Sequence, residues 1–218
     1  MSTQKFSKSE AIQFGWNTMK KNISFLADLL ILVGLIYFIP TLITGLLEDV
    51  APILSTVISI LSWGLFRVIE MGLIKIALMF CDGEEPKLSH LFSCFPLFLN
   101  YLLGLILYGL IVLGGIILLI VPGIIWGIKF QFFDYFIVDK KCGPIEALKR
   151  SSAITKDTKW NLFSFDLLLF LINLFGALCL LVGLFATVPT TLIAMAFVYR
   201  KLLNQAEESK VLEIPEVS

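Results

Sequence analysis

Long apolar stretches alternate with short polar segments along the chain. An α-helix needs about 20 consecutive apolar residues to cross a hydrocarbon core roughly 30 Å thick. The pattern therefore predicts an all-α, multi-pass membrane helical bundle of about six transmembrane helices, with amphipathic helices on the cytoplasmic side. The expected spans are Phe25–Leu47, Ile53–Phe80, Leu97–Val121, Gly123–Val138, Leu162–Val188 and Thr190–Leu203.

The polar segments before the first, third and fifth spans predict amphipathic helices. Ser7 and Glu10 form a capping-box pattern at the start of the first, while Pro86 and Pro144 stand near the first turns of the second and third. Such helices either lie in the headgroup plane or pack against the protein's own spans, and the sequence leaves both open. The apolar positions at helical spacing are Ile12, Trp16, Met19 and Ile23 in the first segment and Leu88, Leu91, Phe92 and Phe95 in the second.

A glycine followed by an Ile/Val-Pro pair recurs along the chain. It stands in LVGLIYFIPT (Leu32–Thr41), LGGIILLIVPG (Leu113–Gly123) and LVGLFATVPT (Leu181–Thr190). Because internal repeats are common in membrane folds, we expect a single transmembrane domain over residues 1–207, made of three repeat-like units at about 8–80, 86–138 and 143–205. Each unit would hold an amphipathic helix, a span, a proline and a second span. Residues 208–218 form a short polar tail.

The composition argues against a soluble globular domain. Hydrophobic residues make up 58% and charged residues 16% of the chain, whereas soluble domains average about 45–50% and about 25%. The net charge is zero, so no global basic field is present to attract nucleic acid. Residues 1–24 are polar and lack the pattern of a cleavable signal peptide, so the first apolar stretch is expected to be a retained span.

Histidine and cysteine are too few for a typical metal site. His90 is the only histidine, and the four cysteines show no CxxC pairing, whereas a zinc site needs about four N or S ligands at close spacing. The chain also lacks GxxxxGK[ST], HExxH and GxSxG motifs. His90, beside Ser89 and Ser93, is the one conventional base near the headgroups. We therefore expect no metal, no cofactor and no enzymatic activity.

The distribution of lysine and arginine predicts the topology. Apart from Arg67, Lys75 and Lys129, these cations fall in the N-terminal segment, in the polar connectors, or at and after the end of the last span. The positive-inside rule then places both termini and the three amphipathic helices in the cytoplasm. That compartment is reducing, so no disulfides are expected. The candidate headgroup-facing residues are Lys20, Lys21, Lys149, Arg150, Lys156 and Lys159.

Ionisable residues inside the spans are candidate functional residues, because each costs roughly 2.5–3.5 kcal/mol or more at the bilayer centre. Arg67 and Glu70 are three residues apart, so they share a helix face and can pair. Lys129 and Asp134 lie on different faces of their helix and need partners on another helix, for which Arg67 and Glu70 are available. The four would then form one intramembrane polar cluster, either a structural ion-pair network or a site for a solute or lipid headgroup.

One long stretch of the chain resembles a bacterial membrane-protein family. LLIVPGIIWGIKFQFFDYFIVDKKCGPIEALKRSSAITKDTKWNLF combines an apolar run, Pro-Gly, a second apolar run ending in Val-Asp, then Gly-Pro, Glu-Ala-Leu and a serine. It resembles the glycerophosphoryl diester phosphodiesterase membrane-domain family and related uncharacterised bacterial integral membrane families, over about residues 97–203. The matching positions are Pro122, Gly123, Val138, Asp139, Gly143, Glu146, Ala147, Leu148 and Ser151.

The resemblance implies a fold and a location, the bacterial inner or plasma membrane. It implies no activity, because in that family the catalytic carboxylates and metal belong to a separate cytosolic domain that these 218 residues do not contain. The expected function is that of a non-catalytic multi-pass integral membrane protein that engages lipid or a partner in envelope or membrane maintenance. The alternative is a small transporter or lipid-moving protein that uses the intramembrane charges. Expected partners are membrane lipids and either a membrane-protein partner or a second copy, with no nucleic acid.

Overall fold

The computed structural model describes residues 6–179 and 182–212, and this part of the chain is helical, without a strand. Five segments are long and apolar enough to cross a membrane: Ile23–Leu47, Pro52–Cys81, Leu88–Leu118, Ile120–Lys140 and Lys159–Leu178. The helices are α1 (Lys8–Lys21), α2 (Ile23–Leu47), α3 (Pro52–Cys81), α4 (Phe98–Leu118), α5 (Ile120–Phe130), α6 (Phe133–Lys140), α7 (Pro144–Ile154), α8 (Lys159–Leu178) and α9 (Leu184–Leu212), with short 3₁₀ turns η1 (Leu88–Phe92) and η2 (Phe95–Leu97).

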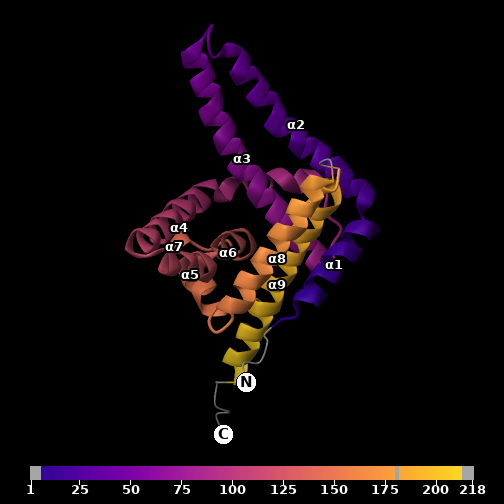
Figure 1. Cartoon of the computed structure of the whole chain (residues 1–218), viewed down its shortest axis with the longest axis vertical. Coiled ribbons are helices and arrows are strands. Elements are labelled where there is room, and N and C mark those ends of the chain that lie inside the picture. Colours follow the sequence, from indigo (N-terminus) through magenta and orange to yellow (C-terminus); the bar gives the residue numbers. More distant parts are fainter. Residues whose placement is uncertain (1–5, 180–181, 213–218) are drawn as a thin grey trace.

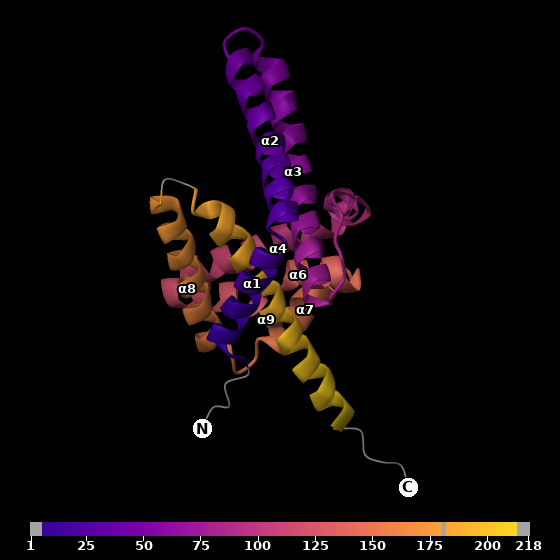
Figure 2. The same cartoon turned by 90° about the vertical axis from the view of Figure 1, so that its right-hand side faces the viewer.

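Three helical hairpins extend from a common core. The α2–α3 hairpin reaches far beyond the rest of the molecule, and the α4–α5 hairpin lies in a different direction, to the left in Figure 1. Figure 2 shows the α2–α3 hairpin separated from the α8–α9 pair. α9 contains the sixth predicted span but is not among the five segments above, and it continues to Leu212, past the predicted start of the tail at residue 208.

The core surrounds the short helix α6. Figure 1 shows this helix end-on in the middle of the molecule, with α4, α5, α7 and α8 around it. Tyr199 of α9 contacts two of its rings, at centroid distances of 5.2 Å to Tyr135 and 5.2 Å to Phe136. The buried positions on α6 are Phe133, Tyr135, Phe136, Ile137 and Val138.

The three prolines of the predicted repeat stand at different places in their hairpins. Pro40 lies inside α2, the first helix of its hairpin, whereas Pro122 and Pro189 lie in the second helices, α5 and α9. The turn between α4 and α5 is at Leu119, whose backbone is extended, so the expectation that Pro122 marks the end of a span was wrong. Pro122 is the third residue of α5, where a missing N–H removes no helical hydrogen bond. The division into three units therefore stays a prediction.

Glycines bring α4 and α5 into close contact after this turn. A Cβ added to Gly123 would stand 2.4 Å from Cγ1 of Ile116, and one added to Gly115 would stand 2.8 Å from Cα of Gly123. Both distances are far below van der Waals contact, so only glycine allows the two backbones to approach this closely. The tight α4–α5 hairpin depends on this pair.

Helix α1 packs against α9. A Cβ added to Gly15 would stand 2.3 Å from the carbonyl oxygen of Thr190, and Ala11 and Met19 are buried on the same face. The structure thus shows α1 packed on one of the protein's own helices. The predicted apolar stripe is not the packed face throughout, because Trp16 and Ile23 are 42% and 62% exposed.

The other two polar segments also differ from amphipathic surface helices. Residues 88–97 form η1 and η2, where Leu91 is buried and Phe95 is 67% exposed. α7 begins with Pro144 as predicted. Its inner face is core, however, because Ala147, Leu148, Ser151 and Ile154 are buried.

Candidate functional site

The predicted fourth span, Gly123–Val138, is two helices. α5 has 11 residues and ends at Phe130, while α6 has 8 residues and begins at Phe133. At 1.5 Å per residue they are about 16 Å and about 12 Å long, so neither alone crosses a core of roughly 30 Å. Together they form the Ile120–Lys140 segment, which is long and apolar enough to cross, but the predicted single helix is interrupted at Gln131 and Phe132. Broken helices occur at membrane depth only where protein or water surrounds the freed backbone groups.

Two hydroxyl side chains of the α7 segment hold the break in place. Ser151 Oγ accepts a hydrogen bond from the backbone N–H of Phe132 (3.1 Å) and donates one to the carbonyl oxygen of Lys129 (3.2 Å). Thr155 Oγ1 donates to the same oxygen at 2.9 Å. Ser151 and Thr155 are fully buried, so the N–H of Phe132 and the carbonyl oxygen of Lys129 are paired with protein at the break.

One ion pair lies beside this break. Arg67 Nη1 is 2.7 Å from Glu70 Oε2 on α3, as the spacing predicted. Tyr101 of α4 donates its hydroxyl to the same oxygen at 3.0 Å. The arginine also lies 5.8 Å from the centre of the Trp63 ring. The side chains of the pair are 24% and 33% exposed, so they are partly shielded rather than fully buried.

Lys129 and Asp134 do not join this pair. Lys129 Nζ lies 4.9 Å from the centre of its neighbour's ring, Phe130. Asp134 Oδ1 accepts from the backbone N–H of Tyr135 at 2.8 Å and is within electrostatic range of Glu70. Among the described residues, neither Lys129 nor Asp134 forms an ion pair. The predicted four-charge cluster is thus an ion pair with a nearby carboxylate, and Lys129 lies apart from it.

Two more polar side chains near the core keep unpaired atoms. Nε2 of Gln131, at the α5–α6 break, and Oδ1 of Asp166, on α8, are buried without a hydrogen-bond partner in the described part of the chain. Buried polar atoms normally bond to protein or to ordered water. These two atoms are therefore candidate positions for internal water molecules.

Sequence reasoning missed an ionic junction where the ends of α3 and α6 meet the middle of α9. Arg200 binds Asp139 through both ends of its guanidinium, at 2.7 and 2.9 Å, and contacts Asp82 at 2.6 Å. Tyr199 donates its hydroxyl to Asp139 at 3.1 Å. Asp139 belonged to the resemblance motif and Arg200 served only to define topology. Both residues stand near the ends of their predicted spans, Gly123–Val138 and Thr190–Leu203, and this was the available clue to the pairing.

The predicted headgroup-facing cations do not share one environment. Lys20 lies over the Trp16 ring at 5.4 Å. Lys21 lines a cavity of about 490 Å³ that Glu84 and Glu85 also line. On α7, Arg150 pairs with Glu146. Of the remaining three, Lys149 and Lys156 are exposed and Lys159 is half-buried.

Lys159 lies at a second cavity, a groove between α5 and α8. Its volume is about 660 Å³, within the roughly 300–1,000 Å³ of typical ligand sites. Its apolar part comes mainly from α5. Trp160, which sequence reasoning did not single out, is 78% exposed here. The lining residues are Val121, Ile124, Ile125, Ile128, Asp157, Lys159, Trp160, Asn161 and Phe163.

The remaining candidate groups have local roles. Nδ1 of His90 accepts a hydrogen bond from the backbone N–H of Lys87 at 3.0 Å, so this nitrogen is used in a turn. The four cysteines are free. Burial raises the pKa of the Cys142 thiol, which donates to the carbonyl oxygen of Phe136 at 3.4 Å. No group of three or more His, Cys, Asp or Glu residues in the described chain is arranged to hold a metal ion.

Comparison with known proteins gives relatives without an assigned function. "Uncharacterized protein Mb2590" of Mycobacterium bovis is 28% identical over 141 residues, and "Uncharacterized protein Rv2560" of Mycobacterium tuberculosis is 27% identical over 141 residues. In each case the match covers 64% of this chain and 43% of the relative, so the chain spans less than half the length of these proteins. No solved structure is significantly similar.

A family match covers a larger part of the chain. Residues 57–211 match the family described as "Domain of unknown function (DUF7847)". This result agrees with the expectation of an uncharacterised bacterial family, and it supplies no link to glycerophosphoryl diester phosphodiesterases. The matched region runs from α3 to α9 and includes the broken helix, the ionic junction and the groove. The protein belongs to the DUF7847 family.

Proposed function

We propose that this protein is a non-catalytic, multi-pass integral membrane protein that engages lipid in bacterial envelope or membrane maintenance. The observation that carries the proposal is the apolar surface of the hairpins. In the most apolar stretch of α2 only 6% of the residues are buried inside the protein, and Phe38, Leu46 and Ile53 are 63%, 71% and 82% exposed. Contiguous apolar surface of this kind marks a membrane or protein interface.

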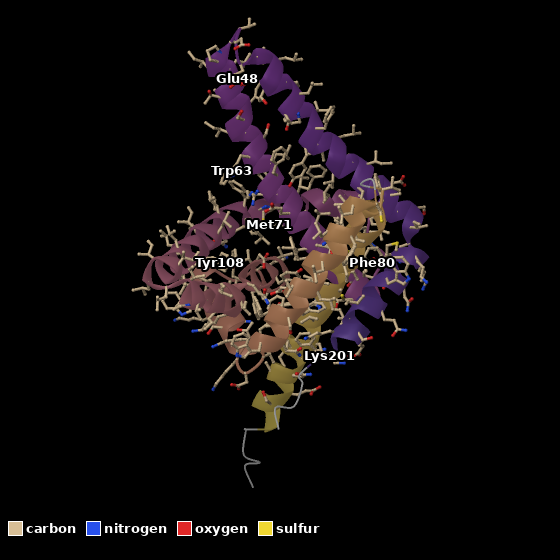
Figure 3. All side chains as sticks on the ribbon, in the orientation of Figure 1. Glu48, Trp63, Met71, Phe80, Tyr108 and Lys201 are labelled. Atoms are coloured by element: carbon tan, nitrogen blue, oxygen red, sulfur yellow. The ribbon has the colours of Figure 1, made fainter. Side chains whose placement is uncertain are left out.

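The charge distribution supports an orientation for this insertion. Figure 3 places Glu48, at the tip of the α2–α3 hairpin, at the opposite end of the molecule from Lys201. The other two hairpin tips carry no charged residue and expose Ile117 and Leu178 by 76% and 71%. The positive-inside rule therefore favours the α2–α3 and α8–α9 tips outside and both termini in the cytoplasm, while the α4–α5 hairpin points in a different direction. The resemblance to membrane-domain families supports the same location.

The orientation can be tested with a native cysteine. Cys179 is exposed at the tip of the α8–α9 hairpin, whereas Cys94 and Cys142 are buried. A membrane-impermeant maleimide should label the full-length protein in intact cells, and Cys179→Ser should abolish the labelling. In that background Asp49→Cys should restore labelling, and Lys20→Cys should be labelled only after the membrane is permeabilised. Labelling of Lys20→Cys in intact cells would overturn the proposed topology.

A small transporter or lipid-moving protein is the second candidate. The broken α5–α6 helix favours it, because discontinuous helices form the central sites of many transporters. Three cavities have no lining residue among Arg67, Glu70, Lys129 and Asp134. They are the α5–α8 groove, the Lys21 cavity and a cavity of about 230 Å³ between α2 and α3. The test is lipid movement between the two leaflets of proteoliposomes that contain the protein. Movement that Asp134→Asn abolishes would favour this candidate over the non-catalytic lipid-binding one.

A further inference from the structure

One wall of the α5–α8 groove is an apolar face of α5. Val121, Ile124, Ile125 and Ile128 stand at positions i, i+3, i+4 and i+7, which places them on one face of α5. Ile124 is 45% exposed and Ile128 is 9% exposed, so the face runs from an open rim to a buried floor. Phe163 of α8 lines the opposite side.

The end of the groove at the start of α8 is polar and positive. Lys159 is the first residue of α8, and the helix begins without a side-chain cap or an acidic residue in its first turn. Its first N–H groups therefore lack helical acceptors, and the helix dipole adds positive potential there. Lys159 forms no ion pair with another residue in the described chain. An anionic group at this position would satisfy both features.

A carboxylate lies next to this positive end. Asp157 lines the groove too, in a left-handed backbone conformation with φ of 66°. It is exposed and, like Lys159, has no ion-pair partner in the part of the chain that is described. Opposite charges two residues apart at one end of an apolar slot match a zwitterionic molecule with an apolar tail.

We propose that the groove binds a glycerophospholipid with a primary ammonium headgroup, of the phosphatidylethanolamine type. The phosphate accepts hydrogen bonds from Lys159 Nζ and from the first N–H groups of α8, and the ammonium group faces Asp157. One acyl chain lies along the Ile124 face of α5. Trp160, 78% exposed at the mouth, then stands at the headgroup level, where tryptophan is enriched. This inference rests on the proposed membrane location and names the lipid class.

Native mass spectrometry of the full-length protein tests the headgroup contacts. The protein is purified in mild detergent and titrated with phosphatidylethanolamine or phosphatidylglycerol. The unsubstituted protein should bind phosphatidylethanolamine more tightly. Lys159→Gln should weaken binding of both lipids by about fivefold, as expected for one cation near a headgroup, and Asp157→Asn should remove the preference between them. Asparagine also tolerates the left-handed conformation, so the turn is kept.

Matched variants separate the groove from the general lipid surface. Lys87→Gln and Asp28→Asn change exposed residues outside the groove and should bind lipid normally. Ile124→Asn should weaken binding, whereas Ile106→Asn on α4, at a residue of similar exposure (50%), should not. Thermal unfolding confirms that each variant is folded.

Two outcomes would overturn the lipid site. One is equal lipid binding by Lys159→Gln and Lys87→Gln. The other is a groove occupied by a second copy of the chain, seen as a dimer that Ile124→Asn dissociates. Neither result would change the topology measured by maleimide labelling, so the membrane proposal and the groove proposal can fail separately.

Discussion

The α2–α3 hairpin and the α5–α7 segment use the same side chains in opposite ways. In the hairpin, hydroxyls bond mainly to their own helix: Thr41 Oγ1 donates to the carbonyl oxygen of Tyr37 (2.8 Å) and Ser59 Oγ to that of Ser55 (2.9 Å). In α7, Ser151 bonds instead to the backbone of another segment. A hydroxyl that bonds its own helix hides its polarity from lipid, whereas one that crosses to a broken helix determines tertiary structure.

The two regions also differ in how much protein surrounds them. α2 has two buried residues along its 25, whereas α6 has five along its 8. An uninterrupted, exposed helix such as α2 satisfies nearly all of its backbone groups internally and needs only lipid around it. The broken segment depends on α7 for its backbone partners, so polar substitutions there should have larger effects than in the hairpin.

The largest expected difference comes from serine. Ser151→Ala leaves the buried N–H of Phe132 without an acceptor and should lower the free energy of unfolding by about 2 kcal/mol. The matched change in the hairpin, Ser59→Ala, should alter it by less than about 0.5 kcal/mol. Thermal or denaturant unfolding in detergent micelles measures both. Equal effects of the two variants would show that the α7 bonds do not hold the break.

Glycine offers a second contrast, with opposite signs in the two regions. A Cβ at Gly123 would meet Ile116 at 2.4 Å, whereas one at Gly34 in α2 has nothing within 4 Å. Gly123→Ala should therefore destabilise by about 1–2 kcal/mol through overpacking. Gly34→Ala should stabilise by about 0.5–1 kcal/mol, because alanine is the better helix former. The same unfolding measurement gives the sign of each change in stability. A stabilising effect of Gly123→Ala would contradict the close α4–α5 contact.

Sequence reasoning predicted best where local rules decide the structure. Apolar length located the helices of the α2–α3 hairpin to within two residues, the Ser7 cap forms with Glu10 N–H at 3.3 Å, and Arg67 pairs with Glu70 at the expected spacing. Sequence reasoning failed where contacts between distant segments decide the structure. Nothing local marks the break after Phe130, because the partners that stabilise it, Ser151 and Thr155, follow some twenty residues later.

The candidate site was only partly predictable for the same reason. Lys159 was recognised as a cation near headgroups, but the groove that it lines depends on how α5 and α8 meet. The Arg200–Asp139 contact joins residues 61 positions apart, and composition or periodicity cannot pair such residues. Pro122 misled because proline suits a first helical turn as well as a loop.

The smallest expected effect concerns the charges beside the break. Exchanging the pair, Arg67→Glu with Glu70→Arg, should restore most of the roughly 1 kcal/mol that either single change removes, because each single change places two like charges on one helix face. Glu70→Lys with Lys129→Glu should give no such recovery, because Lys129 lies over Phe130 instead of beside Glu70. Unfolding of the four single and two double variants in one detergent provides the comparison. Recovery in the Lys129 pair would return that lysine to the cluster and give the broken segment a charge contact with α3.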